Sequence, residues 1–155
     1  MTDGGSSIPA VWALLRTLAT GRDVAELGTA FGDGTAAMAE TARSVVTVEL
    51  DPDRAAKARD RLTPFGNVEA LEGDSYALLA GRGPFGLVFA DGGNYDWEAI
   101  LGLVAPGGLI VKDDLTPGRP AKGDAVREFL LGDARLAAVE VLTTPTTAAI
   151  VAVRR

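Results

Sequence analysis

Residues 25–36 read AELGTAFGDGTA and place Gly28, Gly32 and Gly34 between an apolar run and an alanine-rich run. An apolar strand that passes through a glycine-rich turn into a helix brings free backbone N–H groups to the helix start, where they bind anionic groups. The spacing is G-x-x-x-G-x-G, whereas dinucleotide-binding folds use G-x-G-x-x-G. Glu26 also lies just ahead of the turn, where its charge repels a pyrophosphate. The turn therefore predicts a ligand other than a nicotinamide dinucleotide.

Strand and helix patterns alternate on both sides of this turn. Five apolar runs predict strands, and they span residues 23–27, 44–50, 67–73, 85–91 and 107–113. Runs without polar alternation are typical of parallel strands that are covered on both faces. Residues 136–144 and 147–155 predict two more strands, and a connection of two residues permits only an antiparallel hairpin. The fold class is therefore α/β: a seven-stranded, mostly parallel sheet with an antiparallel C-terminal hairpin and helices on both faces.

Composition narrows the function classes. The 155 residues suit one domain, 1–155. Fifteen Lys and Arg against 21 Asp and Glu give a net charge of −6, which disfavours nucleic acid as a partner. The absence of cysteine and histidine removes disulfides, thiolate chemistry and the commonest general base. No signal-peptide pattern or membrane-length apolar run is present, so we expect a cytoplasmic protein with no membrane partner.

The turn fits a ligand that carries a cation beside a carboxylate. The cationic part would lie near Glu26, while the carboxylate would meet the N–H groups at the helix start around Gly34 and Thr35. S-adenosylmethionine is such a ligand.

Later strand ends supply candidates for the rest of this cofactor. Glu49 lies twenty-one residues after Gly28, where an acid accepts hydrogen bonds from both ribose hydroxyls. Leu50 is placed to cover one face of the adenine. Asp74 or Ser75, after the third strand, is placed to accept from the adenine amino group, and capping the next helix is the alternative role.

Four segments together resemble the class I S-adenosylmethionine-dependent methyltransferases. They are VAELGTAFGDGT at residues 24–35, VVTVELD at 45–51, FGLVFADG at 85–92 and LVAPGGLIVKDDL at 103–115. The closing hairpin also matches, because the seventh strand of that superfamily is antiparallel. The resemblance implies a Rossmann-like sheet, S-adenosylmethionine as the cofactor and methyl transfer as the reaction.

Within the superfamily the sequence looks most similar to the small cation-dependent O-methyltransferases of the catechol and caffeoyl-coenzyme A types. This resemblance implies a divalent ion, Mg, Mn or Ca, held by Asp91, Asp113 and Asp114. It also makes Asp91 both a catalytic and a cofactor-binding residue. Asp114 stands where the family usually has Asn, which keeps an oxygen ligand. Gly93 and Asn94 stand where the family commonly has Asp and Lys, and Asn94 cannot serve as the base.

Strand geometry restricts the acids at the end of the fifth strand. Asp113 and Asp114 point to opposite faces unless the chain bends there, and the following Thr-Pro-Gly favours a bend; otherwise one acid caps the next loop. By the same alternation, Lys112 faces away when Asp113 faces the pocket, so a solvated or salt-bridged lysine is expected and a general base is the alternative. Residues 113–124 form either a lid or a solvated connection.

Three functions remain open from the sequence. The first is methyl transfer to a small-molecule acceptor, most simply an oxygen, by an enzyme that can be a homodimer. The second is a non-catalytic S-adenosylmethionine-binding module or partner subunit. The third, an aminopropyltransferase, would need more acids than Asp91 and Asp96 and ranks last. Tyr95 and Trp97 either line a pocket for an aromatic acceptor or form the packing face of the next helix.

Overall fold

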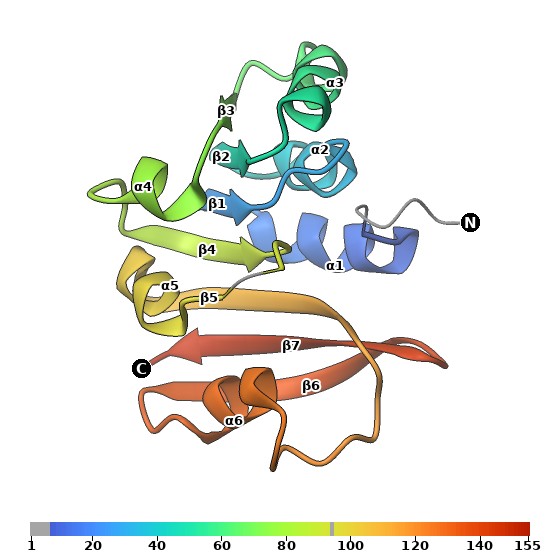
Figure 1. Ribbon diagram of the computed structural model, residues 1–155, viewed down its shortest axis with the longest axis vertical. Helices are drawn as coiled ribbons and strands as arrows, with labels where there is room; N and C mark the ends of the chain where they lie inside the picture. Colours follow the sequence, from blue (N-terminus) through green and yellow to red (C-terminus); the bar gives the residue numbers. More distant parts are fainter. Residues whose placement is uncertain (1–6, 94) are drawn as a thin grey trace.

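The computed structural model describes residues 7–93 and 95–155. It contains a seven-stranded sheet in the order β3-β2-β1-β4-β5-β7-β6, flanked by helices (Figure 1). The strands are β1 (Asp23–Leu27), β2 (Ser44–Glu49), β3 (Val68–Glu72), β4 (Phe85–Ala90), β5 (Val104–Leu115), β6 (Leu136–Thr144) and β7 (Thr147–Arg154). The helices are α1 (Pro9–Ala19), α2 (Asp33–Ala39), α3 (Pro52–Leu62), α4 (Ser75–Leu79), α5 (Trp97–Leu103) and α6 (Ala125–Gly132).

The pairing of the strands confirms the predicted fold class. β1 to β5 pair in parallel, and β7 runs antiparallel to both β5 and β6. Successive strands spread outward from β1 in one direction and from β4 in the other, so the chain reverses its winding between these two neighbours. In open α/β sheets the crevice beyond the carboxyl ends of such a pair is where ligands bind.

Two apolar clusters, one on each face, hold the sheet between its helices. Leu15 of α1 and Met38 of α2 pack on one face. Leu79 of α4, Ile100 of α5 and Leu130 of α6 pack on the other. Burial on both faces explains why the central strands are apolar without alternation. Among the described residues, no helix is long and apolar enough to cross a membrane.

β5 is longer than the predicted 107–113 segment at both ends. Beyond Lys112 its pairing with β7 shifts in register and resumes at Leu115, and Asp114 between them has a positive φ of 57°. The ladder continues past the acids because β7 supplies hydrogen-bonding partners that a local pattern does not reveal. Both acids therefore lie on the strand, and the irregular connection starts at Thr116.

Candidate functional site

The glycine turn after β1 brings the ends of β1 and β4 into close contact. The backbone N–H groups of Asp91 and Gly92 both donate to the carbonyl of Leu27, at 3.0 and 2.7 Å. Gly28 has a φ of +94°, and a Cβ added there would lie 2.8 Å from the backbone nitrogen of Gly92. Only glycine fits this left-handed position against another backbone. The turn therefore forms a wall made of backbone at the switch point of the sheet.

Glu26 lies beneath this wall rather than in it. Its side chain is 1% exposed and accepts hydrogen bonds from the hydroxyls of Thr35 and Thr47. Burial raises the pKa of Glu26 to about 7. The hydrogen bonds from the two hydroxyls act in the opposite direction and only partly offset this effect. Gly32, Gly34 and Thr35 likewise do not line the cavity described below. Direct contacts of these four residues with a cofactor therefore stay predictions.

The raised pKa of Glu26 predicts a pH-dependent stability. The ordinary pKa of 4.5 applies to the unfolded chain, so between about pH 4.5 and 7 the native state binds more protons than the unfolded state. Stability from this group is fully present below pH 4.5 and is lost as the pH rises through 7, by at most about 1.4 kcal/mol per pH unit. We expect Glu26→Gln to flatten this part of the curve of unfolding free energy against pH, measured by urea denaturation. If the slope of unfolding free energy against pH were equal in parent and variant, Glu26 would be ionised in the native state over this whole pH range.

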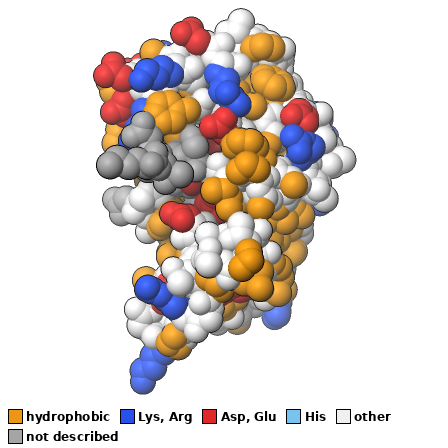
Figure 2. Space-filling view, turned by 90° about the vertical axis from the view of Figure 1, so that its right-hand side faces the viewer, with side chains coloured by type: hydrophobic (Ala, Val, Ile, Leu, Met, Phe, Trp, Pro, Cys, Tyr) orange, Lys and Arg blue, Asp and Glu red, His pale blue; other side chains and the backbone are white. Residues whose placement is uncertain are grey.

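A cavity of about 640 Å³ opens at the carboxyl edge of the parallel strands, the edge that faces the viewer in Figure 2, where acidic side chains lie in the hollow. It brings together Gly28, Glu49, Leu50, Asp74, Ser75, Asp91, Asp113 and Asp114 from the predicted set. It also includes lining residues that the sequence did not single out for this role: Ser7, Ile8, Val11, Leu27, Ala30, Val48, Arg54, Tyr76, Gly92, Gly93, Thr143 and Thr147. Ser7, Ile8, Val11, Thr143 and Thr147 come from segments far from the motifs, and no local signal marks them.

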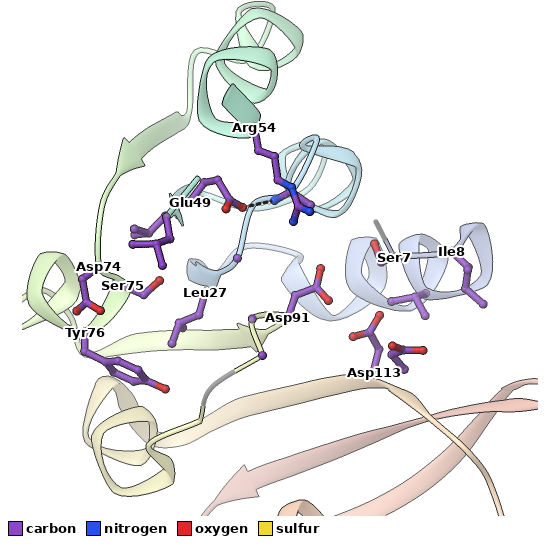
Figure 3. A pocket seen from close by; sticks show the side chains of 18 of the residues that line it. Ser7, Ile8, Leu27, Glu49, Arg54, Asp74, Ser75, Tyr76, Asp91 and Asp113 are labelled. Atoms are coloured by element: carbon purple, nitrogen blue, oxygen red, sulfur yellow. Dashed lines mark hydrogen bonds between the residues drawn. The ribbon is translucent and has the colours of Figure 1, made fainter. Parts of the chain in front are cut away.

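One end of the cavity is formed by the ends of β2 and β3 (Figure 3). Glu49 accepts one backbone hydrogen bond on each carboxylate oxygen, from Ala30 at 2.8 Å and from Asp51 at 3.0 Å. Leu50 is 72% exposed although its side chain is apolar, so it stands uncovered at the rim. Asp74 caps α4 by accepting from Ala77 at 2.8 Å, which confirms its alternative role. This end therefore offers oriented acceptors beside an uncovered apolar surface.

The other end carries the three acids. Asp91 and Asp113 are hydrogen-bonded to each other through their carboxyl groups. Burial, followed by the charges of Asp113 and Glu26, raises the pKa of Asp91 to about 8, and burial also raises the pKa of Asp113. Asp113 is 2% exposed, and its Oδ1 atom has no hydrogen-bond partner. The left-handed Asp114 is the bend that lets both neighbouring acids line the cavity.

The residues around this acid end follow one of the alternatives expected for each. Lys112 is 7% exposed, and its salt-bridged alternative is confirmed: its Nζ lies 3.8 Å from Asp113 Oδ1 and donates to the backbone carbonyl of Asp113 at 2.5 Å. Tyr95 stacks on Trp97 with ring centroids 4.8 Å apart, and both pack on the core of that face rather than line the cavity. Their packing interpretation is therefore confirmed. Asn94, which stands where the resembled family commonly has a lysine, lies outside the described residues.

Comparison with known sequences identifies the family to which this chain belongs. A sequence model described as a methyltransferase domain matches residues 25–115, which include the glycine turn and the two acids of β5. The chain belongs to the methyltransferase domain family. The match covers more than half of the chain, and its limits fall on β1 and on the last residue of β5.

Curated relatives match a comparable share of this methyltransferase domain. A protein-L-isoaspartate O-methyltransferase of Rhodopseudomonas palustris (strain BisB5) is 33% identical over 109 residues, which are 68% of this chain and 48% of the relative. A second protein of the same description, from Bradyrhizobium sp. (strain ORS 278), is 35% identical over 91 residues, or 57% and 42% of the two chains. The domain thus spans about half the length of the curated relatives it matches.

Solved structures match the methyltransferase domain over nearly its whole length. An O-methyltransferase from Bacillus cereus in complex with SAH superposes with a TM-score of 0.79 at 22% identity, covering 98% of this chain and 84% of that one. The O-methyltransferase TomG from Streptomyces achromogenes, in complex with SAM, gives 0.74 at 26% identity and covers 99% and 83%. The Bacillus cereus structure establishes the fold. TomG also resembles this chain in sequence over nearly its whole length.

Proposed function

We propose that this methyltransferase domain transfers a methyl group from S-adenosylmethionine to an oxygen atom of a small molecule. The observation that carries the proposal is one cavity in which the backbone wall at Gly28, the oriented carboxylate of Glu49 and the acids Asp91 and Asp113 face the same space. The SAM complex of TomG and the SAH complex of the Bacillus cereus enzyme support the choice of cofactor.

The cofactor fits with its adenosine toward β2 and β3 and its sulfonium toward β4. The carboxylate oxygens of Glu49 already accept one N–H each, which fixes their remaining lone pairs toward the ribose hydroxyls. Leu50 covers the adenine, beside Asp74 and Ser75. The sulfonium cation then lies near Asp91, where negative potential favours it. In this arrangement Glu26, Gly32, Gly34 and Thr35 act from behind the wall by shaping the turn.

The charge of the acid end selects the class of acceptor. Asp91, Asp113 and Asp114 give this end a negative potential, which disfavours a carboxylate such as the reacting group of an isoaspartyl peptide. Ile8 of the lead-in to α1 and Thr143 of the β6–β7 hairpin line the same region with an apolar and a hydroxyl surface. A neutral acceptor that carries a hydroxyl on an apolar body suits this environment.

Methyl transfer needs the acceptor oxygen in line with the sulfonium methyl group. Placement of two reactants by a protein is worth about 7–11 kcal/mol of the barrier. The C–S bond breaks as the C–O bond forms, so the products are S-adenosylhomocysteine and a methyl ether. At neutral pH the Asp91–Asp113 pair retains one proton, because the pKa of Asp91 is raised to about 8. The ionised oxygen that remains in the pair accepts the proton of the acceptor hydroxyl.

The resemblance to cation-dependent O-methyltransferases also implies a divalent ion, and the described residues can be tested for their fit to it. Within residues 7–93 and 95–155, no group of three or more His, Cys, Asp or Glu side chains is arranged to hold a metal ion. Asp91 and Asp113 are hydrogen-bonded to each other, and Lys112 already lies beside Asp113. As they lie, these residues do not fit the ion, so no step above uses it. The metal role of Asp91, Asp113 and Asp114 stays a prediction of the resemblance.

Binding of S-adenosylhomocysteine tests the cofactor half of the proposal. We expect Glu49→Ala to raise its dissociation constant roughly 10- to 150-fold in calorimetric titration, since a hydrogen bond to a charged group contributes about 1.5–3 kcal/mol. Glu72→Ala, an exposed acid at the end of the neighbouring strand β3, is the matched control and should bind like the parent. Equal affinities of the Glu49 variant and the parent would reduce Glu49 to a structural acid.

Turnover distinguishes the enzyme from a non-catalytic binding module. S-adenosylhomocysteine release should accompany incubation with S-adenosylmethionine and a catechol, and should be absent with an isoaspartyl peptide. Tight cofactor binding without turnover of phenols, alcohols or the peptide would favour the module instead. Preferential turnover of the peptide would overturn the argument from the acids.

A further inference from the structure

We propose that Lys112 is a positioning residue whose ammonium group supplies the cation of the acid pair Asp91–Asp113, so that the site functions without a divalent ion. The binding part of this proposal is independent of the proposed function; only its kinetic part rests on it. Lys112 does not line the cavity, so it acts on the acceptor through Asp113 rather than by contact.

Lys112 reaches the acid pair from the opposite face of the sheet. It pairs in register with Ile150, whose side chain belongs to the cluster beneath α5 and α6. The side chain then extends along the ring of Tyr95, with Nζ 5.3 Å from the ring centroid. Because the backbone turns at Asp114, the carbonyl of Asp113 faces back toward this ammonium and accepts from it at 2.5 Å. The bend thus brings a cation from one face to a carboxylate on the other.

The two buried groups compensate each other's charge. A buried ammonium without a counter-charge and a buried carboxylate oxygen without a partner are both costly. Asp113 Oδ1 has no hydrogen bond, and the Lys112 nitrogen lies 3.8 Å from it. Among the described residues, this is the only ion pair that involves Asp91, Asp113 or Asp114. The positive charge of Lys112 also opposes the burial that raises the pKa of both paired acids.

The same ammonium opposes a divalent ion at this oxygen. A metal bound at Asp113 Oδ1 would carry two positive charges next to a cation that is already within ion-pair distance of that atom. Like charges at such a separation in a buried site repel strongly. A metal would therefore bind only after the buried Lys112 side chain withdrew from Asp113.

Direct binding of Mn²⁺, measured by electron paramagnetic resonance, tests this without any acceptor. We expect no stoichiometric binding at about 1 mM Mn²⁺ for the parent or for Lys112→Arg, which keeps the charge. Lys112→Met removes the charge at similar length and should bind one ion at least about tenfold more tightly than the parent. Lys122→Met, in the exposed connection after β5, is the control and should match the parent. Stoichiometric binding by the parent would overturn the proposal, even if Lys112→Met failed to fold.

Kinetics with S-adenosylmethionine and a catechol form the second test. Parent turnover should be unchanged after exhaustive chelation. Lys112→Met should lose about tenfold in kcat with little change in KM for S-adenosylmethionine, and Lys112→Arg should retain most of the activity. Parent turnover abolished by chelation and restored by Mg²⁺ would overturn the proposal, as would an unchanged kcat in Lys112→Met. If no acceptor is turned over, the proposed function fails and the Mn²⁺ measurement still decides the role of Lys112.

Discussion

Replacement of Gly28 by alanine is expected to lower the free energy of unfolding by about 2–5 kcal/mol and to weaken cofactor binding sharply. Two costs add at this position. The left-handed φ of +94° is unfavourable for any residue with a Cβ, and that Cβ would lie 2.8 Å from the backbone nitrogen of Gly92. Backbone cannot rotate away as a side chain can, so β1 and β4 would have to separate at the wall of the cavity.

Gly21→Ala is the matched control for this prediction. Gly21 also has a positive φ, +69°, but a Cβ there meets nothing within 4 Å. It should therefore show only the conformational cost, about 1–2 kcal/mol. Urea denaturation of both variants separates the two contributions, and calorimetric titration with S-adenosylhomocysteine reports the damage to the wall. Equal destabilisation of the two variants would contradict the importance of the close approach between Gly28 and Gly92.

Arg127→Met is expected to cost about 3–5 kcal/mol, which is the usual effect of breaking a buried ion pair and leaving its partner uncompensated. Arg127 is 1% exposed on α6. Its guanidinium donates to Glu140 on β6 at 2.8 and 2.9 Å, to Asp124 at 2.5 Å and to the carbonyl of Thr116 at 2.7 Å. One side chain thus joins a helix, the edge strand and both ends of the connection after β5.

Arg135→Met provides the comparison. Arg135 makes ion pairs with Glu98 and Asp133, as Arg127 does with Asp124 and Glu140, but about half of its side chain is exposed. Solvent screening makes such pairs weak, so the urea midpoint should hardly change. Limited proteolysis gives a second measurement: cleavage within residues 116–124 should be faster in Arg127→Met only. Similar midpoints for the two variants would mean that Arg127 is replaceable by packing alone.

Local pattern was sufficient for most of the secondary structure. The strands at Asp23–Leu27 and Leu136–Thr144 begin and end where the sequence predicts, because a turn residue lies close to each end of these short apolar-rich runs. The order of strands and helices also followed from their alternation, and the antiparallel hairpin followed from a connection too short for a crossover. For the site, the strand ends located Gly28, Glu49, Asp74, Asp91 and Asp113, since parallel strands end at one edge.

Contacts between segments distant in the sequence determine the features that the local sequence pattern does not predict. The extra length of β5 depends on β7, whose Ala148 pairs with Leu115 beyond the two acids. The path of Lys112 depends on the left-handed Asp114 and on the ring of Tyr95, which lies in the connection between β4 and α5. Glu26 was predicted to face the ligand because of its place beside the glycines. The hydroxyls of Thr35 and Thr47 hold it inside instead, and neither contact is visible as a spacing.

The reversed direction of β7 has a consequence for how this domain can diversify. Because β7 is antiparallel to β5, the β6–β7 turn lies at the same edge as the cavity and places Thr143 and Thr147 in its wall. The turn itself comprises only residues 145–146, and its tip is exposed. Surface turns tolerate insertions better than the elements they connect. We therefore expect that new acceptor specificities can arise by lengthening this hairpin, while the residues proposed to bind the cofactor, at the ends of β1 to β3, stay unchanged at the far end of the cavity.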